Sequence, residues 1–339
     1  MDRSPASAPV RVLEWVRFPN GIWNMPRELV RGIAADMAHV AHVQVSSPAT
    51  RAEAEALLPE VDVVLGFAVR PKNFARATRL RWIHSTAASV TGMLFPELVA
   101  SDVVVTNARG LHAESMAEHA LAMMLAFARK LHHARDAQRV REWTQAPLWE
   151  EPPAMGSLAG ATLGVVGLGK VGSAIAVRAR AMGMRVIAVR VHPASAPAPA
   201  DEQWHVSRLR ELLPRVDWLV LAAPHTPETE RLIGREELSL MKSSARLMNL
   251  GRGALVDEAA LIDALRARQL AGAALDVFEE EPLPRTSPLW DMPEVILTPH
   301  TSGLGPRYWE RAMAQFTANL EHFIAGEPLE NVVDKRAGY

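Results

Sequence analysis

The side chains best suited to chemistry in this chain are Arg252, Glu281 and His300, each of which follows a different expected strand. They lie 29 and 19 positions apart, and His300 ends the motif Thr298-Pro299-His300. An imidazole suits proton transfer near neutral pH, and a neighbouring carboxylate favours its charged form and fixes its tautomer. A guanidinium can bind a carboxylate and polarise the adjacent carbonyl. Together these groups suit the interconversion of a 2-keto acid and a 2-hydroxy acid.

Each of these residues also has a simpler interpretation. An isolated Arg, Glu or His after a strand is more often a surface or capping residue, and an acidic run such as Glu279-Glu280-Glu281 is usually a solvated face. The position of Glu281 directly before Pro282 favours it over its two neighbours.

A glycine loop, Gly167-Leu168-Gly169-Lys170-Val171-Gly172, lies in mid-chain between an apolar, β-rich run at 162–166 and a run of helical composition at 170–182. A strand, a glycine turn and a helix in this order make the pattern specific. The glycines allow a tight turn and let a pyrophosphate approach the backbone and the helix N-terminus. The chain is therefore expected to bind a dinucleotide.

The end of the next expected strand indicates which dinucleotide. In NAD-specific domains an acid near this position bonds the ribose hydroxyls. Residues 185–192 contain no acid, and Asp201 comes too late. Arg190, 18 residues after Gly172, is either a clamp for a 2′-phosphate, assisted by His192, or an exposed arginine in an enzyme that uses both cofactors. The sequence favours NADP(H), with NAD(H) as the alternative.

Alternating strands and helices must position these residues. Strands are expected at 11–16, 39–45, 61–66, 80–84 and 103–106, and again at 162–167, 185–189, 218–222, 246–250, 273–277 and 295–298. Helical runs are expected at 27–37, 51–58, 114–141, 258–268 and 306–326, with a loop at 192–200 and an irregular connector at 147–153. This alternation predicts an α/β fold with doubly wound parallel sheets. Trp143 and Trp149 are expected to be packing or interface residues.

The composition limits the other functions open to the chain. At 339 residues it has room for two domains, and its formal net charge of -1 provides no field for nucleic acid or an anionic membrane. Without cysteine it has neither disulfides nor thiolate metal sites, and the histidines other than His300 show no metal spacing, so no metal is expected. Residues 1–9 lack the apolar core of a signal peptide, and the apolar run at 120–128 is too short to span a bilayer. A soluble, cytoplasmic protein is expected.

With these motifs in this order, the chain resembles the D-isomer-specific 2-hydroxyacid dehydrogenase family over nearly its whole length. The resemblance rests on the glycine loop, on residues 249–257 and 276–282, and on Thr298-Pro299-His300. It implies that Arg252 binds the substrate, that His300 is the acid/base, and that Glu281 is its partner. It implies a substrate loop at Ala88, Ser89 and Val90, although the family usually has glycine where Ser89 stands. The implied cofactor contacts beyond the glycine loop, Arg190 and His192 are Ala223, Pro224, Leu250, Gly251, Asp276, Ser302 and Gly303, with Asp276 near the nicotinamide carboxamide.

The resemblance also implies an architecture and an activity. A Rossmann dinucleotide-binding domain, residues 111–303, is expected as an insertion into a flavodoxin-like substrate domain made of residues 1–110 and 304–339. A homodimer is expected, joined largely through the dinucleotide domains and the helix after Glu114. The implied activity is an NAD(P)-dependent reduction of a small 2-keto acid, with glyoxylate and hydroxypyruvate as leading candidates. A 3-phosphoglycerate dehydrogenase and a non-catalytic, dinucleotide-sensing corepressor remain as alternatives.

Overall fold

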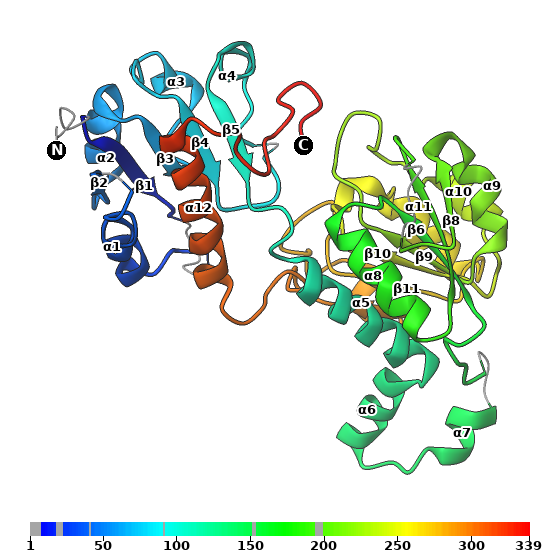
Figure 1. Cartoon of the computed structure of the whole chain (residues 1–339). Coiled ribbons are helices and arrows are strands. Elements are labelled where there is room, and N and C mark those ends of the chain that lie inside the picture. Colours follow the sequence, from blue (N-terminus) through cyan, green and yellow to red (C-terminus); the bar gives the residue numbers. More distant parts are fainter. Residues whose placement is uncertain (1–7, 18–22, 41, 91, 151–153, 194–198) are drawn as a thin grey trace. The chain divides into compact units, whose positions relative to one another are not determined.

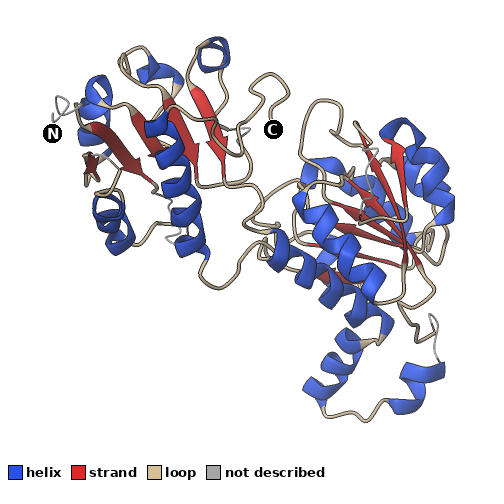
Figure 2. Ribbon diagram, in the orientation of Figure 1, coloured by secondary structure: helices blue, strands red, loops and turns tan. Residues whose placement is uncertain are grey.

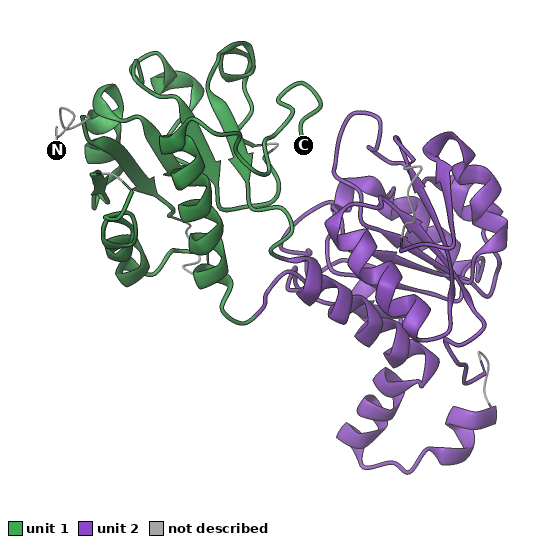
Figure 3. Cartoon of the chain, in the orientation of Figure 1, with its two compact units in different colours: residues 1–111, 306–339 green, residues 112–305 purple. Residues whose placement is uncertain are grey.

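The computed structural model describes residues 8–17, 23–40, 42–90, 92–150, 154–193 and 199–339. The chain divides into two compact units, of which the first combines residues 1–111 with 306–339 and the second is residues 112–305 (Figure 3). Each unit is built on one parallel sheet with helices against its faces (Figure 2). Residues 1–7, part of the segment without a signal-peptide core, lie outside the described residues.

The first unit has a five-stranded parallel sheet in the order β2-β1-β3-β4-β5 (Figure 1). This is the flavodoxin-like order, in which the chain changes direction along the sheet between β1 and β3. The strands are β1 (Val10–Trp15), β2 (Val43–Ser46), β3 (Val63–Gly66), β4 (Trp82–Ser85) and β5 (Val104–Asn107). The helices are α1 (Arg27–Asp36), α2 (Arg51–Leu57), α3 (Pro71–Phe74), α4 (Pro96–Ala100) and α12 (Tyr308–Ala325).

The last residues of the chain cover the β5 edge of this sheet. Val333 donates its backbone N–H to Val105 at 2.8 Å, and Thr106 and Val332 form an antiparallel bridge. An edge strand left open would present unpaired N–H and C=O groups to solvent. The tail therefore completes the first unit, in which it lies beside a strand more than two hundred residues earlier in the chain.

The second unit has a seven-stranded parallel sheet in the order β12-β11-β10-β9-β6-β7-β8. Its strands are β6 (Thr162–Val166), β7 (Arg185–Arg190), β8 (Glu202–His205), β9 (Trp218–Leu221), β10 (Arg246–Asn249), β11 (Gly272–Leu275) and β12 (Val295–Leu297). Its helices are α5 (Ala113–Ala128), α6 (Leu131–Val140), α7 (Gln145–Glu150), α8 (Lys170–Ala181), α9 (Leu209–Leu212), α10 (Arg235–Leu240) and α11 (Glu258–Arg266). The chain runs from β6 to one side and returns through β9 to the other, so the loop after β6 lies at the switch point where dinucleotides bind. The predicted fold class is confirmed.

Alternate residues of the central strand supply the two cores of this sheet. Val165 packs with Ile175 of α8 and Met124 of α5, whereas its neighbour Val166 belongs to the core on the opposite face, with Leu261 of α11. Successive side chains of a strand point to opposite faces, and burial on both faces requires a continuous apolar run. The sheet is thereby held rigidly behind the loops at its carboxyl edge.

The single helix expected at 114–141 is wrong, because the structure has two helices there. The helix α5 ends at Ala128, α6 begins at Leu131, and Lys130 between them has φ of 50°. The carbonyl of Ala128 accepts from the N–H of Gly156, which takes it out of the helical ladder. The apolar stripe that packs α5 also stops at this point, since no residue of α6 is buried.

Three further expectations need correction. Six strands were expected in the second unit, but β8 makes a seventh; it pairs with β7 alone and buries only Trp204, so it lacks an apolar period. The connector expected at 147–153 is partly helical, since α7 covers Gln145–Glu150, while residues 151–153 lie outside the described residues. The strand expected at 39–45 begins only at Val43, because residues 37–40 form a turn that closes α1. Of the loop expected at 192–200, residues 194–198 are not described.

Candidate active site

The glycine loop after β6 has a backbone that two of its glycines make possible. Gly167 has φ of 93°, and a Cβ there would lie 2.8 Å from the backbone of Ala223. A Cβ on Gly172 would lie 2.0 Å from the carbonyl oxygen of Gly167. A side chain at either position would force the strand, the turn and α8 apart, so these glycines hold the first turn of α8 against the end of β6.

Gly169 has a different role in the same loop. It is the N-cap of α8 with ordinary backbone angles, and a Cβ built there would have no neighbour within 4 Å. No side chain among the described residues caps the first N–H groups of this helix. Open space in front of uncapped N–H groups at a positive helix end fits a pyrophosphate. The loop therefore fits the diphosphate of a nicotinamide dinucleotide.

Arg190 lies at the carboxyl end of β7, beside this loop. Its Nη1 donates to the carbonyl of Leu168 at 3.5 Å, and its side chain is half-buried. His192, two residues further on, is exposed. Asp201 precedes β8 and lies at the opposite end of the strands, where it accepts from the N–H of Val186 and pairs with Arg180. Asp201 therefore does not bring a carboxylate close to Arg190.

Two other predicted cofactor segments follow β9, which neighbours β6, and β10, which neighbours β9. Ala223 and Pro224 are separated from the end of β9 by one residue, and the backbone of Ala223 lies against Gly167. Leu250 and Gly251 follow β10, where Leu250 is buried and a Cβ on Gly251 would lie 2.8 Å from the carbonyl oxygen of Ala223. The three turns after β6, β9 and β10 thus form one surface at the carboxyl edge of the sheet.

Arg252 is positioned by a tight turn after β10. The buried Asn249 side chain donates to the carbonyl of Arg252 at 2.8 Å and accepts from the N–H of Gly251 at 3.1 Å. A Cβ on Gly253 would lie 1.8 Å from the carbonyl oxygen of Phe278, so this turn lies directly on the loop after β11. Burial lowers the pKa of Arg252 and the charge of Glu281 opposes this, but a guanidinium stays charged at neutral pH.

Glu281 and His300 are in direct contact. The Nδ1 of His300 lies 2.7 Å from one carboxylate oxygen of Glu281, while the other oxygen accepts from the N–H of Phe278 at 3.1 Å. Glu279 instead faces Glu258, whose backbone N–H lies 3.5 Å from its carboxylate. Of the three adjacent glutamates, Glu281 is thus the one that meets the imidazole. About half of the His300 side chain remains exposed, which leaves the ring accessible.

The turn that presents His300 is built on a buried carboxylate. Asp276, which is fully buried, accepts from the Thr298 hydroxyl at 2.6 Å and from the N–H groups of Thr301 and Ser302 at 2.9 and 3.0 Å. Its own carbonyl accepts from the N–H of His300, which has φ of 53°. Asp276 therefore organises the 298–302 turn. Its contact with a nicotinamide carboxamide, and those of Ser302 and Gly303 with the cofactor, stay predictions.

Two histidines of the second unit that the sequence did not single out contact the same turn. His119 on α5 has its Nε2 3.1 Å from the Thr298 hydroxyl, and His112, the N-cap of α5, has its Nδ1 2.9 Å from the carbonyl of Gly303. They stand seven residues apart, which is two helical turns, so they share one face of the helix. That face was visible in the sequence, but the element it would meet was not.

The predicted substrate loop belongs to the first unit. Residues 88–90 follow β4, where the carbonyl of Ala88 accepts from the side chain of Asn107 at 2.7 Å and Val90 is buried. The Tyr308 hydroxyl donates to the carbonyl of Thr86, just ahead of the loop. The loop is thus anchored from β5 and from α12.

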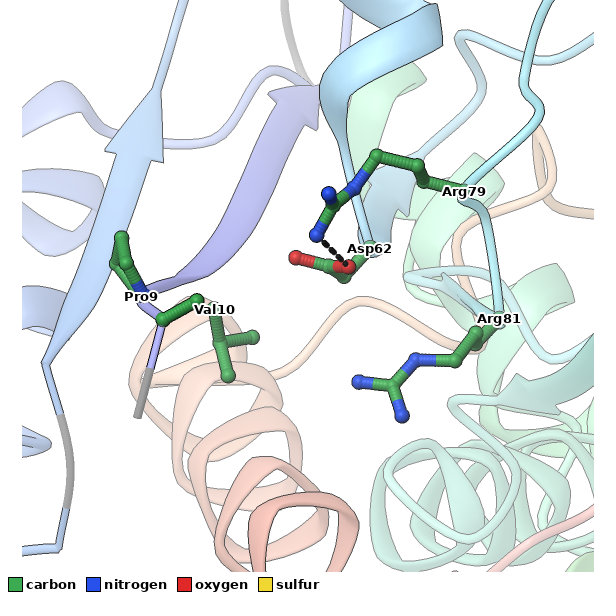
Figure 4. A pocket seen from close by; sticks show the side chains of 6 residues that line it. Pro9, Val10, Asp62, Arg79 and Arg81 are labelled. Carbon is green, nitrogen blue, oxygen red and sulfur yellow. Dashed lines mark hydrogen bonds and ion pairs between the residues drawn. The ribbon is translucent and has the colours of Figure 1, made fainter. Parts of the chain in front are cut away.

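A separate hollow of about 390 Å³ in the first unit contains none of the predicted site residues (Figure 4). Its lining residues are Ala8, Pro9, Val10, Asp62, Arg79 and Arg81. Arg79 reaches Asp62 at 3.1 Å there. Val10 begins β1, and Asp62 and Arg81 directly precede β3 and β4, so the hollow lies at the amino ends of the strands. Ligands of such sheets bind at the carboxyl ends, which sets this hollow apart from the candidate site.

The part of the chain that the structure describes contains no group of three or more His, Asp or Glu side chains arranged to hold a metal ion. None of the helices within the described ranges is long and apolar enough to cross a membrane.

Comparison with known proteins places these features in context. The sequence model of the D-isomer specific 2-hydroxyacid dehydrogenase family, NAD binding domain, matches residues 121–302. The glyoxylate reductase of Aeropyrum pernix is 37% identical over 266 residues, which are 77% of this chain and 78% of that protein. The D-3-phosphoglycerate dehydrogenase of Methanocaldococcus jannaschii is 32% identical over 301 residues, which are 88% of this chain and 56% of that protein. The chain thus spans about half the length of the phosphoglycerate dehydrogenases it matches.

Solved structures are similar over almost the whole chain. A D-isomer specific 2-hydroxyacid dehydrogenase from Xanthobacter autotrophicus, in complex with NADPH and MES, has a TM-score of 0.81 at 30% identity and covers 98% of this chain and 100% of its own. An NADPH-dependent glyoxylate/hydroxypyruvate reductase from Sinorhizobium meliloti, in complex with NADP and sulfate, has a TM-score of 0.79 at 27% identity and covers 97% and 100%.

Proposed function

Because the chain belongs to the D-isomer specific 2-hydroxyacid dehydrogenase family, we propose that it is an NAD(P)-dependent oxidoreductase that reduces a small 2-keto acid, with glyoxylate and hydroxypyruvate as the leading candidates. The observation that supports this most directly is the 2.7 Å contact between His300 and Glu281 in the unit that also holds the half-buried Arg252. Similarity to glyoxylate reductases at up to 37% identity supports the substrate class.

The three side chains have distinct parts in this reaction. A bound reduced nicotinamide supplies the hydride that C2 of the keto acid receives. Arg252 binds the carboxylate of the acid and polarises its carbonyl. With Nδ1 held by Glu281, His300 uses Nε2 to donate a proton to the carbonyl oxygen as the hydroxyl forms. By binding Nδ1, Glu281 fixes the direction in which Nε2 points.

NADP(H) is the proposed cofactor, with NAD(H) as the alternative. Arg190 supplies a cation at the end of β7 beside the glycine loop, and Asp201 lies at the opposite end of the strand pair. Loss of an acid removes the repulsion of a 2′-phosphate, and a guanidinium adds charge-assisted hydrogen bonds to it. Relatives of known structure with NADPH or NADP bound are consistent with this choice.

The cofactor proposal is tested by replacing Arg190 with Ser. The ratio of kcat/KM with NADPH to that with NADH should fall about tenfold or more, the size of one or two charge-assisted hydrogen bonds. Arg185→Ser, at the other end of β7 and exposed, is the matched control and should leave the ratio unchanged. Comparable kcat/KM with both cofactors in the unmodified enzyme would remove the basis for the clamp.

One experiment distinguishes the proposed function from its alternatives. Similarity to D-3-phosphoglycerate dehydrogenases supports oxidation of 3-phosphoglycerate, a substrate whose phosphate would require a further basic site. A steady-state matrix of glyoxylate, hydroxypyruvate, pyruvate and phenylpyruvate, each with NADH and NADPH, together with 3-phosphoglycerate and NAD(P)⁺, separates these reactions. Tight NADPH binding without turnover on any of these substrates would instead favour a non-catalytic sensor.

The same matrix includes the variant His300→Ala. Removing the general acid should reduce kcat by about 10²–10⁴-fold while NADPH binding is retained. Activity close to that of the unmodified enzyme would mean that another group transfers the proton.

We further propose that the chain forms a homodimer through its second unit. The helices α6 and α7 contain no buried residue, and Trp143 and Trp149 are 89% and 72% exposed. A second copy of the chain is the occupant that the family resemblance implies for this surface.

A further inference from the structure

The turn that presents His300 is attached to α5 at both of its ends. At its start, the hydroxyl of Thr298 lies 3.1 Å from Nε2 of His119. Just beyond its end, the carbonyl of Gly303 lies 2.9 Å from Nδ1 of His112. A Cβ on Gly303 would lie 3.0 Å from that same nitrogen, so the ring of His112 is in close contact with the backbone. One helix face therefore holds a five-residue turn from two sides.

Counting hydrogens determines the direction of the contact at His119. A threonine hydroxyl has one hydrogen, and that of Thr298 is donated to Asp276 at 2.6 Å. The same oxygen must therefore accept from His119, whose Nε2 carries the proton. His119 donates to Thr298, and Thr298 donates to Asp276. The two oxygens of the buried carboxylate also accept from the backbone N–H groups of Thr301 and Ser302, one each.

The electrostatics of this chain of hydrogen bonds agree with a neutral donor. Burial lowers the pKa of His119, and the charge of Asp276, 4.0 Å from Nε2, only partly opposes this. The ring is therefore uncharged at neutral pH and acts as a fixed N–H donor with one tautomer. A half-buried imidazole whose tautomer is set in this way is suited to orienting a neighbour.

We infer that His119 is a positioning residue for His300, acting through Thr298 and Asp276 to fix the turn from which the imidazole reaches the substrate. The inference rests on the proposed role of His300 as proton donor. His300 has φ of 53°, a conformation that the surrounding contacts must impose, and its N–H is bound to the carbonyl of Asp276. A proton donor misplaced by about 1 Å can lose two orders of magnitude in rate, so support of this turn matters for turnover.

Four substitutions at or beside His119 test this inference. His119→Gln keeps an N–H donor at the reach of Nε2, whereas the amide of His119→Asn is too short to reach Thr298, and His119→Leu has no donor. Glu118→Leu, on the exposed side of the same helix, is the control for a change in α5 itself. For each variant, kcat and KM for the keto acid, NADPH affinity and thermal stability are measured.

The expected result is a split between kcat and KM. The Asn and Leu variants should lose about tenfold in kcat with the KM for the keto acid within about twofold of that of the unmodified enzyme, because Arg252 is untouched. The Gln variant should recover most of kcat, and Glu118→Leu should retain it. A purely structural role for His119 would lower stability in all three His119 variants without separating Gln from Asn.

Coupling to Thr298 provides a second readout. Thr298→Val removes the hydroxyl that links His119 to Asp276, so adding His119→Leu to it should cost no further activity. Additive losses, or kcat unchanged in the Asn and Leu variants, would overturn the inference. His300→Ala in the same series separates the two hypotheses. If it abolishes turnover while His119→Leu does not, only the positioning role fails; if it retains turnover, the proposed function of His300 fails first.

Discussion

At the scale of single residues, His300 combines an unfavourable backbone conformation with a chemically useful side chain. Its φ of 53° lies in the left-handed region, which costs about 1–3 kcal/mol for a residue with a Cβ. Its ion pair with Glu281 is partly exposed, at 2.7 Å, so the pair contributes little stability in return. If His300 is the proton donor, substitution should separate the backbone cost of this position from the loss of its imidazole.

Comparing His300→Gly with His300→Ala isolates the backbone cost. Both variants lose the imidazole and should lose about 10²–10⁴-fold in kcat. Glycine accepts a positive φ, so the free energy of unfolding of His300→Gly should be about 0.5–1 kcal/mol higher than that of His300→Ala. Urea unfolding of the two proteins measures the difference. Equal stabilities would mean that the turn relaxes to a negative φ once the side chain is absent.

The environment of His84 on β4 predicts that acid lowers the stability of the first unit. It is fully buried, its Nδ1 lies 2.8 Å from the Thr106 hydroxyl, and burial lowers its pKa to about 3. The unfolded chain takes up this proton below pH 6.5 while the folded one does not, so the free energy of unfolding falls as pH drops from about 6.5 toward 3. The slope from one such proton is about 1.4 kcal/mol per pH unit.

The variant His84→Gln, which cannot be protonated, should lose less stability than the unmodified protein between pH 7 and pH 5. The comparison uses the change in unfolding free energy with pH, so a uniformly less stable variant still tests it. Parallel pH dependences would show that His84 is not the group responsible.

At the scale of elements, substitutions at two glycines of the β6-loop-α8 segment should differ in their effects on stability and on dinucleotide affinity. Gly172→Ala places a Cβ 2.0 Å from the Gly167 carbonyl and should lower both thermal stability and dinucleotide affinity. Gly169→Ala meets open space at a φ that alanine accepts, so stability should be unchanged. Its methyl group would occupy the approach of the pyrophosphate, and NADPH affinity should fall at least tenfold. Calorimetric titration with NADPH, together with thermal unfolding, distinguishes the two variants. A Gly169→Ala protein with normal affinity would contradict this placement of the diphosphate.

Elements with a strong apolar period were predictable from the sequence, and those held by tertiary contacts were not. The β6 run and the α8 run gave a local signal on both sides of the glycine loop. The strand β8 has one buried residue in four and exists because β7 offers it a partner. The break between α5 and α6 depends on Gly156, a residue far along the chain that binds the Ala128 carbonyl.

The same distinction applies to the candidate site. Parallel strands place the loops after β10, β11 and β12 side by side, so the sequence could predict a shared edge for Arg252, Glu281 and His300. It could not predict the approach of His112 and His119, because nothing local to α5 indicates which turn its histidine face will meet.

At the scale of the whole molecule, the exposed α6 and α7 helices predict self-association of the second unit. Leu131, Val140, Trp143 and Trp149 expose large apolar side chains on this segment, which Figure 1 shows extending away from the sheet of its own unit. Several large apolar side chains exposed on one segment are typical of an interaction surface. In sedimentation equilibrium the unmodified protein should have twice the mass of the chain, and the double variant Trp143→Ser/Trp149→Ser should shift toward the monomer.

The control for this experiment is Trp290→Ser, which removes an indole that is 54% exposed elsewhere on the second unit. It should leave the mass of the assembly unchanged, since Trp290 follows α11 rather than belonging to the α6–α7 segment. Because no residue of α6 or α7 is buried within the chain, the double variant should fold with an unchanged core. A dimer of undiminished affinity in the double variant would place the contact on another face of the second unit, and a monomeric unmodified protein would remove the homodimer altogether.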